Sequence, residues 1–566
     1  MNYEIIGVIV QITLLLVLSY PLGRYISKVY RGERNFMDFL IPMENKIYQL
    51  CSIDSSEQMN WKRFLKVLLI LNMFWFVWGM ILLVSQGVLP LNPDGNPGQN
   101  VTQAFNTCIS FMVNCNLQHY SGESGVTYFT QLFVIMLFQF VTAATGMAAF
   151  AGMLKGMAEK TTRTLGNFWV YLIKSLTRIL IPLSLIVAMV LILGDVPMTF
   201  HGKQSVTTLE GTEQTISQGP VAAVVAIKQL GTNGGGFYGA NSAHPLENPS
   251  YFTNMIECIS ILLIPMALIW TLGFYLNKMR FSRYIFAVMF FAYLSGVGIV
   301  VYQEMKGDPA ISEMGISQDL GSMEGKEVRF GCAATGLWAV NTTVSSNGSV
   351  NGMHDSLTPL SGMVAMLNMD TNCWFGGVGV GLMNYYIFII IAVFISGLMV
   401  GRTPEFLGKK IEAEEMKIAI ILALLHPLLI LSGTAIATFL ATNNSGLSSE
   451  WLNNPSFHGL SEMLYEYTSS AANNGSGFEG LGDNTSFWNI STGIVLIMGR
   501  YIPIIGQIAI VGILANKKYI PEGAGTLKTD TATFSIMTFA VIVIIAALAF
   551  FPALTLGPIA EFLTMR

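Results

Sequence analysis

Residues 231–237 read Gly-Thr-Asn-Gly-Gly-Gly-Phe and follow directly on a short apolar stretch at residues 221–230. That stretch is too short for a helix to cross a bilayer, and a long apolar segment lies on each side of it. A half-length helix that ends in a glycine-rich turn between two spanning helices is typical of a re-entrant pore loop. Irregular backbone occurs at membrane depth where it is buried in protein or lines a watery cavity. Because this turn carries no charge, its oxygens can replace the water around a cation.

The same glycines also suggest a nucleotide-binding loop. However, no Lys-Ser or Lys-Thr pair follows them, and no alternation of strands and helices surrounds them. The nucleotide interpretation is therefore much the weaker one, and we expect this chain to bind no nucleotide.

The composition predicts a membrane protein. Of 566 residues, 52% are hydrophobic and only 11% are charged, and the mean hydropathy is +0.55. Soluble domains carry about 25% charged residues, so most of this chain must lie in lipid. The net charge of −4 gives no support for a nucleic-acid partner.

The cysteines and histidines indicate no metal or disulfide framework. The six cysteines are scattered and contain no Cys-x-x-Cys pair. His119, His244, His354 and His458 each lie near a polar loop, where a hydrogen-bonded structural histidine is the more common case than a metal ligand.

The hydropathy pattern predicts an all-α polytopic membrane protein with ten transmembrane helices. We expect them at residues 3–20, 64–84, 128–152, 168–194, 251–276, 284–302, 357–400, 416–440, 488–514 and 533–554. The segment 357–400 is too long for one straight span and contains several glycines, so we expect it to be broken. Lys and Arg follow alternate spans, beginning with Arg24, which places both termini outside. The first span has no basic residue before it, so we expect a retained helix.

Eight of these spans form four repeats of helix, half-helix, polar turn and helix around a central pore. The half-helices fall at residues 104–113, 221–230, 332–344 and 459–472. The resulting division is 1–60 (first span and cytoplasmic loop), 61–165, 166–281, 282–412 (with the broken helix) and 413–520 for the four repeats, and 521–566 for the last span. Four polar turns at corresponding places are difficult to explain by composition alone.

The four turns align as the predicted selectivity filter: Asn114-Cys115-Asn116, Thr232-Asn233-Gly234, Ser346-Asn347-Gly348 and Asn473-Asn474-Gly475. None of them contains an acid or a base. A ring of neutral oxygens suits a weakly hydrated monovalent ion better than Mg²⁺, which holds its water tightly. The half-helices also direct their partly negative C-terminal ends at the ring.

Charged and polar residues flank these turns. Gln118 follows the first turn, and Lys228 lies inside the second half-helix, where a charge is expensive. The lysine either pairs with a nearby acid or acts as a fixed positive charge below the filter. The acids Glu123, Glu247, Asp355, Glu462 and Glu479 either concentrate cations at an external mouth or are solvated loop charges.

Several long motifs resemble the KdpA family, the potassium-channel-like subunits of bacterial Kdp potassium-transporting ATPases. They are Ser19-Tyr-Pro-Leu-Gly-Arg24, residues 231–237, Ala240-Asn-Ser-Ala-His-Pro245, Glu247-Asn-Pro249, Met323-Glu-Gly-Lys-Glu327, Met353-His-Asp-Ser356, Gly401-Arg-Thr-Pro-Glu405, Leu407-Gly-Lys-Lys410, Ser469-Ser-Ala-Ala-Asn-Asn474 and Leu556-Gly-Pro-Ile-Ala-Glu561. The resemblance implies that the four turns select K⁺ in the bacterial inner membrane. It also implies partners: a P-type ATPase catalytic subunit, a single-span accessory subunit and a very small membrane subunit.

The resemblance further implies a tunnel from the filter towards the ATPase subunit, with a gating loop in the broken helix. The matching residues are Asp370, Gly376, Gly377, Gly379 and Gly381, and Arg402 matches an arginine near the ATPase contact. Two departures stand out. Cys115 replaces a threonine that is frequent in the family. The loop reads Asp370-Thr-Asn-Cys-Trp374 where the family usually has a Gly-Glu pair, and the family's loop is one residue longer.

Three classes of function remain. The chain has no Asp-Lys-Thr-Gly phosphorylation motif and no Walker A motif, so energy must come from a partner or from an ion gradient. The main prediction is a K⁺-translocating subunit of an ATPase, and the alternative is a stand-alone, gradient-driven K⁺ transporter or channel. A redox membrane anchor is the weakest, because haem ligation needs paired histidines and only His426 lies well inside a predicted span.

Overall fold

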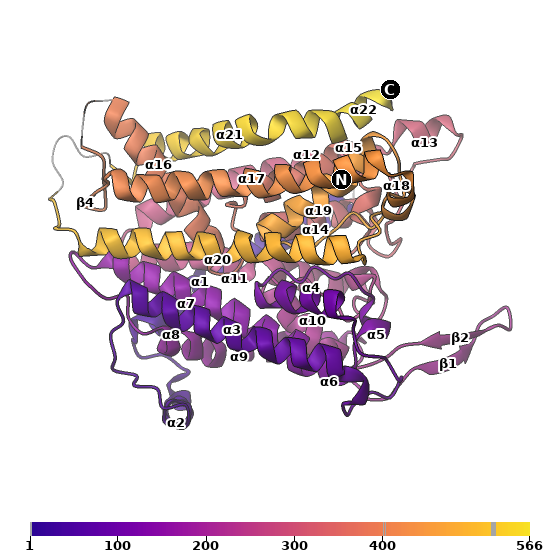
Figure 1. The fold of residues 1–566 in the computed structure, drawn as a ribbon, viewed down its shortest axis with the longest axis horizontal. Helices are drawn as coiled ribbons and strands as arrows, with labels where there is room; N and C mark the ends of the chain where they lie inside the picture. Colours follow the sequence, from indigo (N-terminus) through magenta and orange to yellow (C-terminus); the bar gives the residue numbers. More distant parts are fainter. Residues whose placement is uncertain (1–2, 400, 402, 522–527, 566) are drawn as a thin grey trace.

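The computed structural model describes residues 3–399, 401, 403–521 and 528–565. Ten helical segments in this part of the chain are long and apolar enough to span a membrane. They run nearly parallel along the longest axis of the molecule (Figure 1). Their helices are α1 (Tyr3–Arg31), α3 (Trp61–Ser85), α6 and α7 (Tyr128–Thr130, Leu137–Ala158), α8 and α9 (Phe168–Ser175, Ile181–Leu193), α11 (Tyr251–Leu276), α12 (Met279–Lys306), α16 (Val380–Met399), α17 (Ala413–Asn443), α20 (Ser486–Asn516) and α21 (Ala532–Leu554). Three of the spans contain π-helical turns, Gln131–Met136, Leu176–Leu180 and Thr555–Ile559.

Four shorter helices precede the four predicted filter turns: α4 (Val101–Met112), α10 (Val221–Leu230), α14 (Gly331–Val344) and α19 (Phe457–Ala472). Most of their residues are buried, and α10 and α14 are buried almost throughout. In each repeat a spanning helix follows the turn. In the third repeat that helix is broken, as predicted, into α15 (Pro359–Thr371) and α16, which are joined by an irregular loop.

The spans form an inner and an outer layer. In α7 and α11 more than 70% of the most apolar window is buried inside the protein, whereas in α1 and α3 only 22% is buried. The outer helices therefore present their apolar side chains to lipid. Close packing uses small residues, as is common in membranes. At Gly23 of α1, a side chain would lie 2.5 Å from the carbonyl oxygen of Ala267 on α11.

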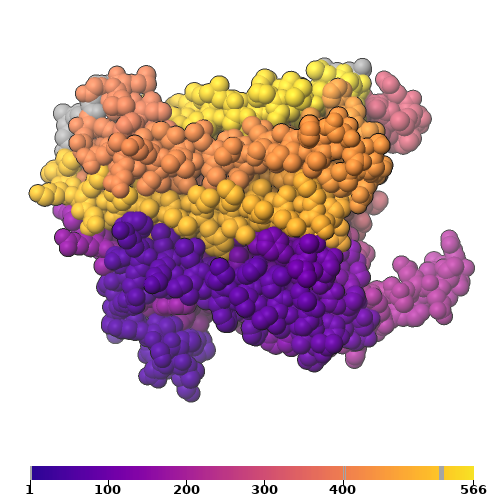
Figure 2. Space-filling model, viewed as in Figure 1, coloured from indigo at the N-terminus to yellow at the C-terminus, as the bar shows by residue number. Residues whose placement is uncertain are grey.

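The remaining elements lie at the two ends of the bundle. The end where β4 and the basic loops lie carries α2 (Ile41–Leu50) and the short pair β3 (Glu405–Phe406) and β4 (Lys409–Lys410). The opposite end carries α5 (Gly122–Gly125), α13 (Pro309–Glu313), α18 (Ser445–Trp451) and α22 (Ala560–Thr564). A hairpin of β1 (Gln204–Thr207) and β2 (Glu213–Ile216) projects from this end, clear of the body (Figures 1 and 2). The start of α1 lies at the same end as α22.

The spans match the predicted ones in number, and several differ in length. The bounds of α10 and α11 are those predicted, whereas α1 continues to Arg31 and α12 begins earlier and ends later than expected. In both longer helices the additional turns carry Lys and Arg, whose long side chains reach water from within a helix. The hairpin and α2 were not predicted.

Candidate ion-binding site

The four short helices end in the same hydrogen-bonded turn. In each turn the middle residue donates its backbone N–H to the carbonyl five positions earlier, and the four N···O distances are 2.9–3.0 Å. The bonds are Cys115 to Ser110, Asn233 to Lys228, Asn347 to Thr342 and Asn474 to Ser469. This closure resembles the Schellman motif, which turns the chain sharply away from a helix end. The alignment of the turns made from sequence therefore corresponds to a common backbone geometry.

The backbone angles repeat as well. The first residue of every turn has a positive φ: 63° at Asn114, 49° at Thr232, 52° at Ser346 and 52° at Asn473. The third residue also has a positive φ: 65° at Asn116, 64° at Gly234, 88° at Gly348 and 105° at Gly475. Residues other than Gly, Asn and Asp rarely adopt a positive φ, so the backbone at Thr232 and Ser346 is strained. Such outliers concentrate at functional sites.

The four turns touch one another in a closed ring. A side chain at Gly234 would lie 2.0 Å from the carbonyl oxygen of Asn347 in the next repeat. The corresponding distances are 2.2 Å from Gly348 to the oxygen of Asn474, and 2.2 Å from Gly475 to the oxygen of Cys115. The first and second turns are joined by Asn114, whose Nδ2 donates to the Thr232 oxygen at 2.9 Å. The repeats therefore follow one another in chain order around the ring.

Many carbonyls of this ring have no hydrogen-bond partner in the described part of the chain. They are those of Asn114, Cys115, Asn116, Ser346, Asn347, Gly348, Asn473, Asn474 and Gly475. Most of these residues are at least 96% buried. The second turn differs, because its three carbonyls accept from Asn114, Gly235 and Asn241. Buried carbonyls are normally hydrogen-bonded. A ring of buried carbonyls without hydrogen-bond partners therefore indicates a site for a cation or its water.

Side chains behind the ring fix its shape. Gln118 forms two hydrogen bonds with Gly236, donating to its oxygen at 3.1 Å and accepting from its N–H at 2.9 Å. Asn347 and Asn474 donate from Nδ2 to carbonyls of Lys228 and Thr342 in the preceding repeats. The middle side chains of the third and fourth turns therefore brace the neighbouring helix end. Cys115 holds the corresponding position in the first turn and is fully buried.

Lys228 pairs with an acid. Its Nζ lies 2.8 Å from Glu247 Oε2 and 2.6 Å from both Asn241 Oδ1 and Ser242 Oγ, and the Lys228 and Glu247 side chains are fully buried. Asn241 in turn donates to the Gly234 carbonyl at 2.6 Å. Of the two roles considered from sequence, the structure supports the ion pair, which stabilises the second turn from behind.

The flanking acids are not all solvated loop charges. Glu247 and Glu462 are fully buried, so neither is a solvated loop charge or a surface attractant for cations. For Glu247 the sequence could not show this, because it lies in a polar stretch after the second turn, whereas Glu462 lies inside the predicted half-helix 459–472. Glu123 accepts from the Gly239 N–H at 2.7 Å, and Glu479 accepts from the Asp355 N–H at 3.0 Å.

The loop between α15 and α16 passes directly beneath the ring. The Gly376 N–H donates to the Val344 oxygen at 2.7 Å, and the Val378 N–H donates to Thr232 Oγ1 at 2.9 Å. Gly376 and Gly379 have φ values of 63° and 84°. A side chain at Gly379 would lie 2.2 Å from the Gly146 oxygen of α7, and one at Gly381 would lie 1.7 Å from the Phe375 oxygen. The predicted loop glycines therefore lie where backbone segments approach most closely.

Arg500 of α20 is a residue that the sequence analysis missed. Its side chain lies beside this loop: side chains at Gly377 and Gly146 would be 3.7 Å and 3.4 Å from its guanidinium. It is 6% exposed and forms no hydrogen bond or ion pair with any described residue. An arginine inside the predicted span 488–514 was the available signal, since intramembrane charges are usually functional. The molecule thus holds a positive charge below the ring.

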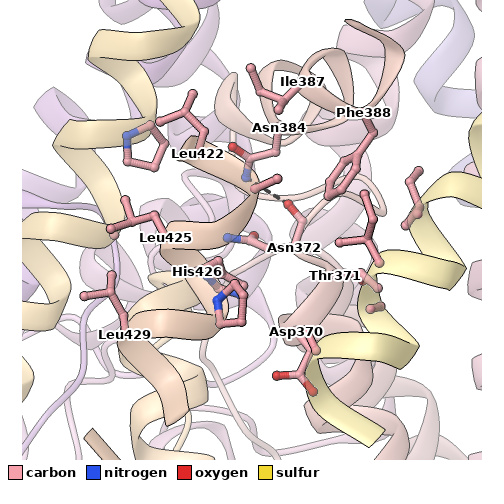
Figure 3. A pocket seen from close by; sticks show the side chains of 18 of the residues that line it. Asp370, Thr371, Asn372, Asn384, Ile387, Phe388, Leu422, Leu425, His426 and Leu429 are labelled. Atoms are coloured by element: carbon pink, nitrogen blue, oxygen red, sulfur yellow. Dashed lines mark hydrogen bonds between the residues drawn. The ribbon is translucent and has the colours of Figure 1, made fainter. Parts of the chain in front are cut away.

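Asp370 lies at the end of α15 and lines a pocket of about 70 Å³ between α15, α16, α17, α20 and α21. In Figure 3 its carboxylate and the His426 ring lie along this pocket with Asn372 and Asn384. A polar chain links the pocket to the third turn. Ser346 Oγ donates to Asn372 Oδ1 at 3.1 Å, Asn384 donates to the Asn372 carbonyl at 2.8 Å, and Gln507 donates to Asn384 Oδ1 at 2.7 Å.

The remaining predicted residues divide as follows. Arg402 lies outside the described residues. His119 and His354 are buried and hydrogen-bonded, to Asn489 and Glu466 and to Tyr465 respectively, and His244 stacks on Tyr238. These three histidines have the structural contacts that were expected.

Comparisons with known proteins identify the family of the chain. Residues 9–563 match the family described as KdpA, potassium-transporting ATPase A subunit. Relatives named potassium-transporting ATPase potassium-binding subunit include those of Bacteroides fragilis, 69% identical over 100% of both chains, and Geobacillus kaustophilus, 48% identical over 98% of both. A solved structure of the potassium transporter TrkH from Vibrio parahaemolyticus aligns with 89% of this chain and 98% of its own, at 14% identity and a TM-score of 0.49. The chain belongs to the KdpA family of potassium-transporting ATPase A subunits.

Proposed function

We propose that this chain is the potassium-binding and translocating subunit of an ATP-driven, high-affinity K⁺ uptake complex. The observation that carries the proposal is the ring of buried, unpaired carbonyls formed by four turns with a common backbone geometry. The relatives' name supplies the ion and the coupling to an ATPase. The chain transports and another subunit hydrolyses ATP.

The chemistry of the ring favours K⁺. Its oxygens are neutral, and the nearest acid of the second turn, Glu247, is already paired with Lys228. A large monovalent ion loses its water at a low free-energy cost, so neutral oxygens are enough to replace that water. Mg²⁺ loses its water reluctantly. The four short helices add the partial negative charge of their C-terminal ends. The filter therefore consists of Asn114, Cys115, Asn116, Thr232, Asn233, Gly234, Ser346, Asn347, Gly348, Asn473, Asn474 and Gly475.

From the ring, the ion's route runs into the pocket beside Asp370. Straight passage towards the opposite end is opposed by the backbone of residues 376–379 and by the charge of Arg500. The chain of Ser346, Asn372, Asn384 and Gln507 offers oxygens from the third turn to the pocket. The pocket opens among α16, α17 and α21, and we place the contact with the ATPase catalytic subunit on that side. The Gly376–Gly381 loop is the gate.

The remaining assignments follow the family. We place the chain in the bacterial inner membrane with both termini outside, because the four short helices lie nearer the end that carries α22 and the basic loops lie at the other (Figure 1). The partners are the P-type ATPase catalytic subunit, a single-span accessory subunit and a very small membrane subunit. The six-part division at residues 60, 165, 281, 412 and 520 is retained, with one short helix in each of the four repeats.

Gly348→Ala tests the filter in the assembled complex. Its added carbon would lie 2.2 Å from the Asn474 oxygen, so the ring must distort. We expect weaker apparent K⁺ affinity and a smaller preference for K⁺ over Na⁺, measured as uptake into proteoliposomes. Gly298→Ala is the matched control, since no atom lies within 4 Å of a side chain there. Wild-type affinity and selectivity in the Gly348 variant would remove the ring from the mechanism.

A further inference from the structure

A second group of potential ligands lies at the outer end of the third and fourth repeats. Asp355 belongs to the 3₁₀ turn His354–Ser356 after the third filter turn, and His458 and Glu462 lie on the first turns of α19. One ligand atom from each of the three residues lies within 4.8 Å of the other two. The His458 and Asp355 side chains are 17% and 13% exposed, which leaves a route from the outer solution.

His458 is held from both ring nitrogens. Its Nδ1 lies 2.7 Å from Glu561 Oε1 on α22, and its Nε2 lies 2.9 Å from Asp355 Oδ1. The ring also stacks on Phe478, with a centroid distance of 5.6 Å. Neutral imidazole can donate from one nitrogen only, so this arrangement holds a second proton on the ring.

Glu462 has an unused oxygen. Its side chain is fully buried, Oε1 accepts from Asn454, and Oε2 has no partner among the described residues. A Cβ atom at Gly480 would lie 2.7 Å from Glu462 Oε1 and 2.7 Å from Asp355 Oδ2. The two carboxylates therefore converge on a space that is open because residue 480 is glycine.

The charges in this group do not balance. Asp355, Glu462 and Glu561 supply three carboxylates against one imidazolium, and none of the three pairs with a Lys or Arg of the described residues. A buried, unpaired carboxylate is unfavourable unless a cation or a proton compensates it.

We propose that Asp355, His458 and Glu462 bind one divalent transition-metal ion of the zinc class from the outer solution. His458 Nε2 and one oxygen from each carboxylate are the ligands, and water completes the coordination. On binding, the proton on Nε2 leaves to solvent, while Nδ1–H stays with Glu561. A carboxylate on the second nitrogen is the usual support of a metal-bound histidine. The nitrogen ligand favours zinc-class ions over Mg²⁺ and Ca²⁺.

Such an ion would join three segments that are far apart in sequence. Asp355 follows the third filter turn, α19 leads into the fourth, and Glu561 lies on the C-terminal helix. The bound ion therefore stabilises the outer rim of the third and fourth repeats against one another. The sequence favoured a hydrogen-bonded structural histidine at His458 over a metal ligand, and its two partners, each 103 positions away, could not be identified from the sequence.

The test is Zn²⁺ binding to the purified complex after chelation, measured by competition with a chromophoric chelator. Because Cys51 is an exposed thiol, a Cys51→Ser background removes its contribution. We expect one Zn²⁺ per chain, and affinity lowered by roughly tenfold or more in Glu462→Gln and in His458→Gln. Glu313→Gln, on exposed α13, is the matched control and should bind as the wild type does.

Two further measurements, of Co²⁺ absorption and of the unfolding temperature, test the same site independently. Co²⁺ bound to the wild type should give the visible absorption of a nitrogen- and oxygen-ligated site, and Glu462→Gln should lose it. Zn²⁺ should also raise the unfolding temperature of the wild type and the Glu313 variant only. Equal Zn²⁺ affinity in the wild type and in both ligand variants would overturn the proposal. So would a wild type that binds no Zn²⁺, or Co²⁺ without that absorption. None of these readings depends on K⁺ selection by the filter.

Discussion

At the scale of single residues, the third position of each turn shows which residue types allow the ring to form. It is glycine in three repeats and Asn116 in the first. Every one has a positive φ, and at the glycines a side chain would also meet the carbonyl of the next turn. Asparagine tolerates positive φ better than most side chains, so Asn116 satisfies the first condition. The sequence predicts the need for such residues; which carbonyl they approach depends on the tertiary arrangement.

Cys115 is the first residue to test. Asn347 and Asn474 occupy the equivalent position and direct their amides to a neighbouring helix end, behind the ring. We therefore expect Cys115→Thr to change K⁺ affinity less than about twofold, because the backbone carbonyl, not the side chain, faces the neighbouring turn.

The check is thiol labelling of Cys115 with small cationic reagents in a background that lacks the exposed Cys51. Slow labelling that K⁺ does not alter is the expected result. Rapid labelling that K⁺ blocks would place the sulfur in the pore.

Arg500 is the second residue to test. Its guanidinium lies beside the loop under the ring without a described acidic partner, so we expect it to repel cations that continue straight through. Arg500→Gln should raise ATP-independent rubidium flux through the complex in proteoliposomes, whereas Arg500→Lys keeps the charge and should stay near the wild-type leak. Equal leak in the Gln and Lys variants would show that the charge is no barrier.

At the scale of elements, hydropathy and helix caps explain which bounds could be predicted. Helix α11 begins at a capping box formed by Ser250 and Thr253, and α10 ends where Gly231 begins the turn, so both bounds are visible in the sequence. Helices α1 and α12 extend past the apolar windows because basic side chains reach water from their ends. The hairpin was missed because nearly all of its residues are exposed, so it has no alternating pattern to detect.

The Lys228–Glu247 pair is the element-scale prediction. Breaking a fully buried pair from one side leaves an uncompensated charge, which costs roughly 3–5 kcal/mol. Lys228→Met should lower the unfolding temperature of the purified complex, and Lys228→Met with Glu247→Gln should recover much of the loss. If the single variant unfolds at the wild-type temperature, the pair does not stabilise the second turn.

At the scale of the whole molecule, the ring joins turns that lie as far apart as residues 114 and 475. The internal repetition is enough to predict four turns, but their order around the ring, the loop below it and the pocket at Asp370 arise from helix packing. The pocket lies among helices of the third and fourth repeats and α21, so the fourfold pattern does not extend to it. On the proposed route, this asymmetry would let the ion leave sideways towards a partner.

The most direct test is to locate the ion itself. The structure of the complex should be determined with Tl⁺ or Rb⁺ in place of K⁺, with the ion identified by its anomalous signal. The account predicts a peak inside the ring, within coordination distance of the Cys115, Asn347 and Asn474 carbonyls, that is lost in Gly348→Ala and kept in Gly298→Ala. Ordered monovalent ions bound elsewhere in this chain, with none inside the ring, would contradict it.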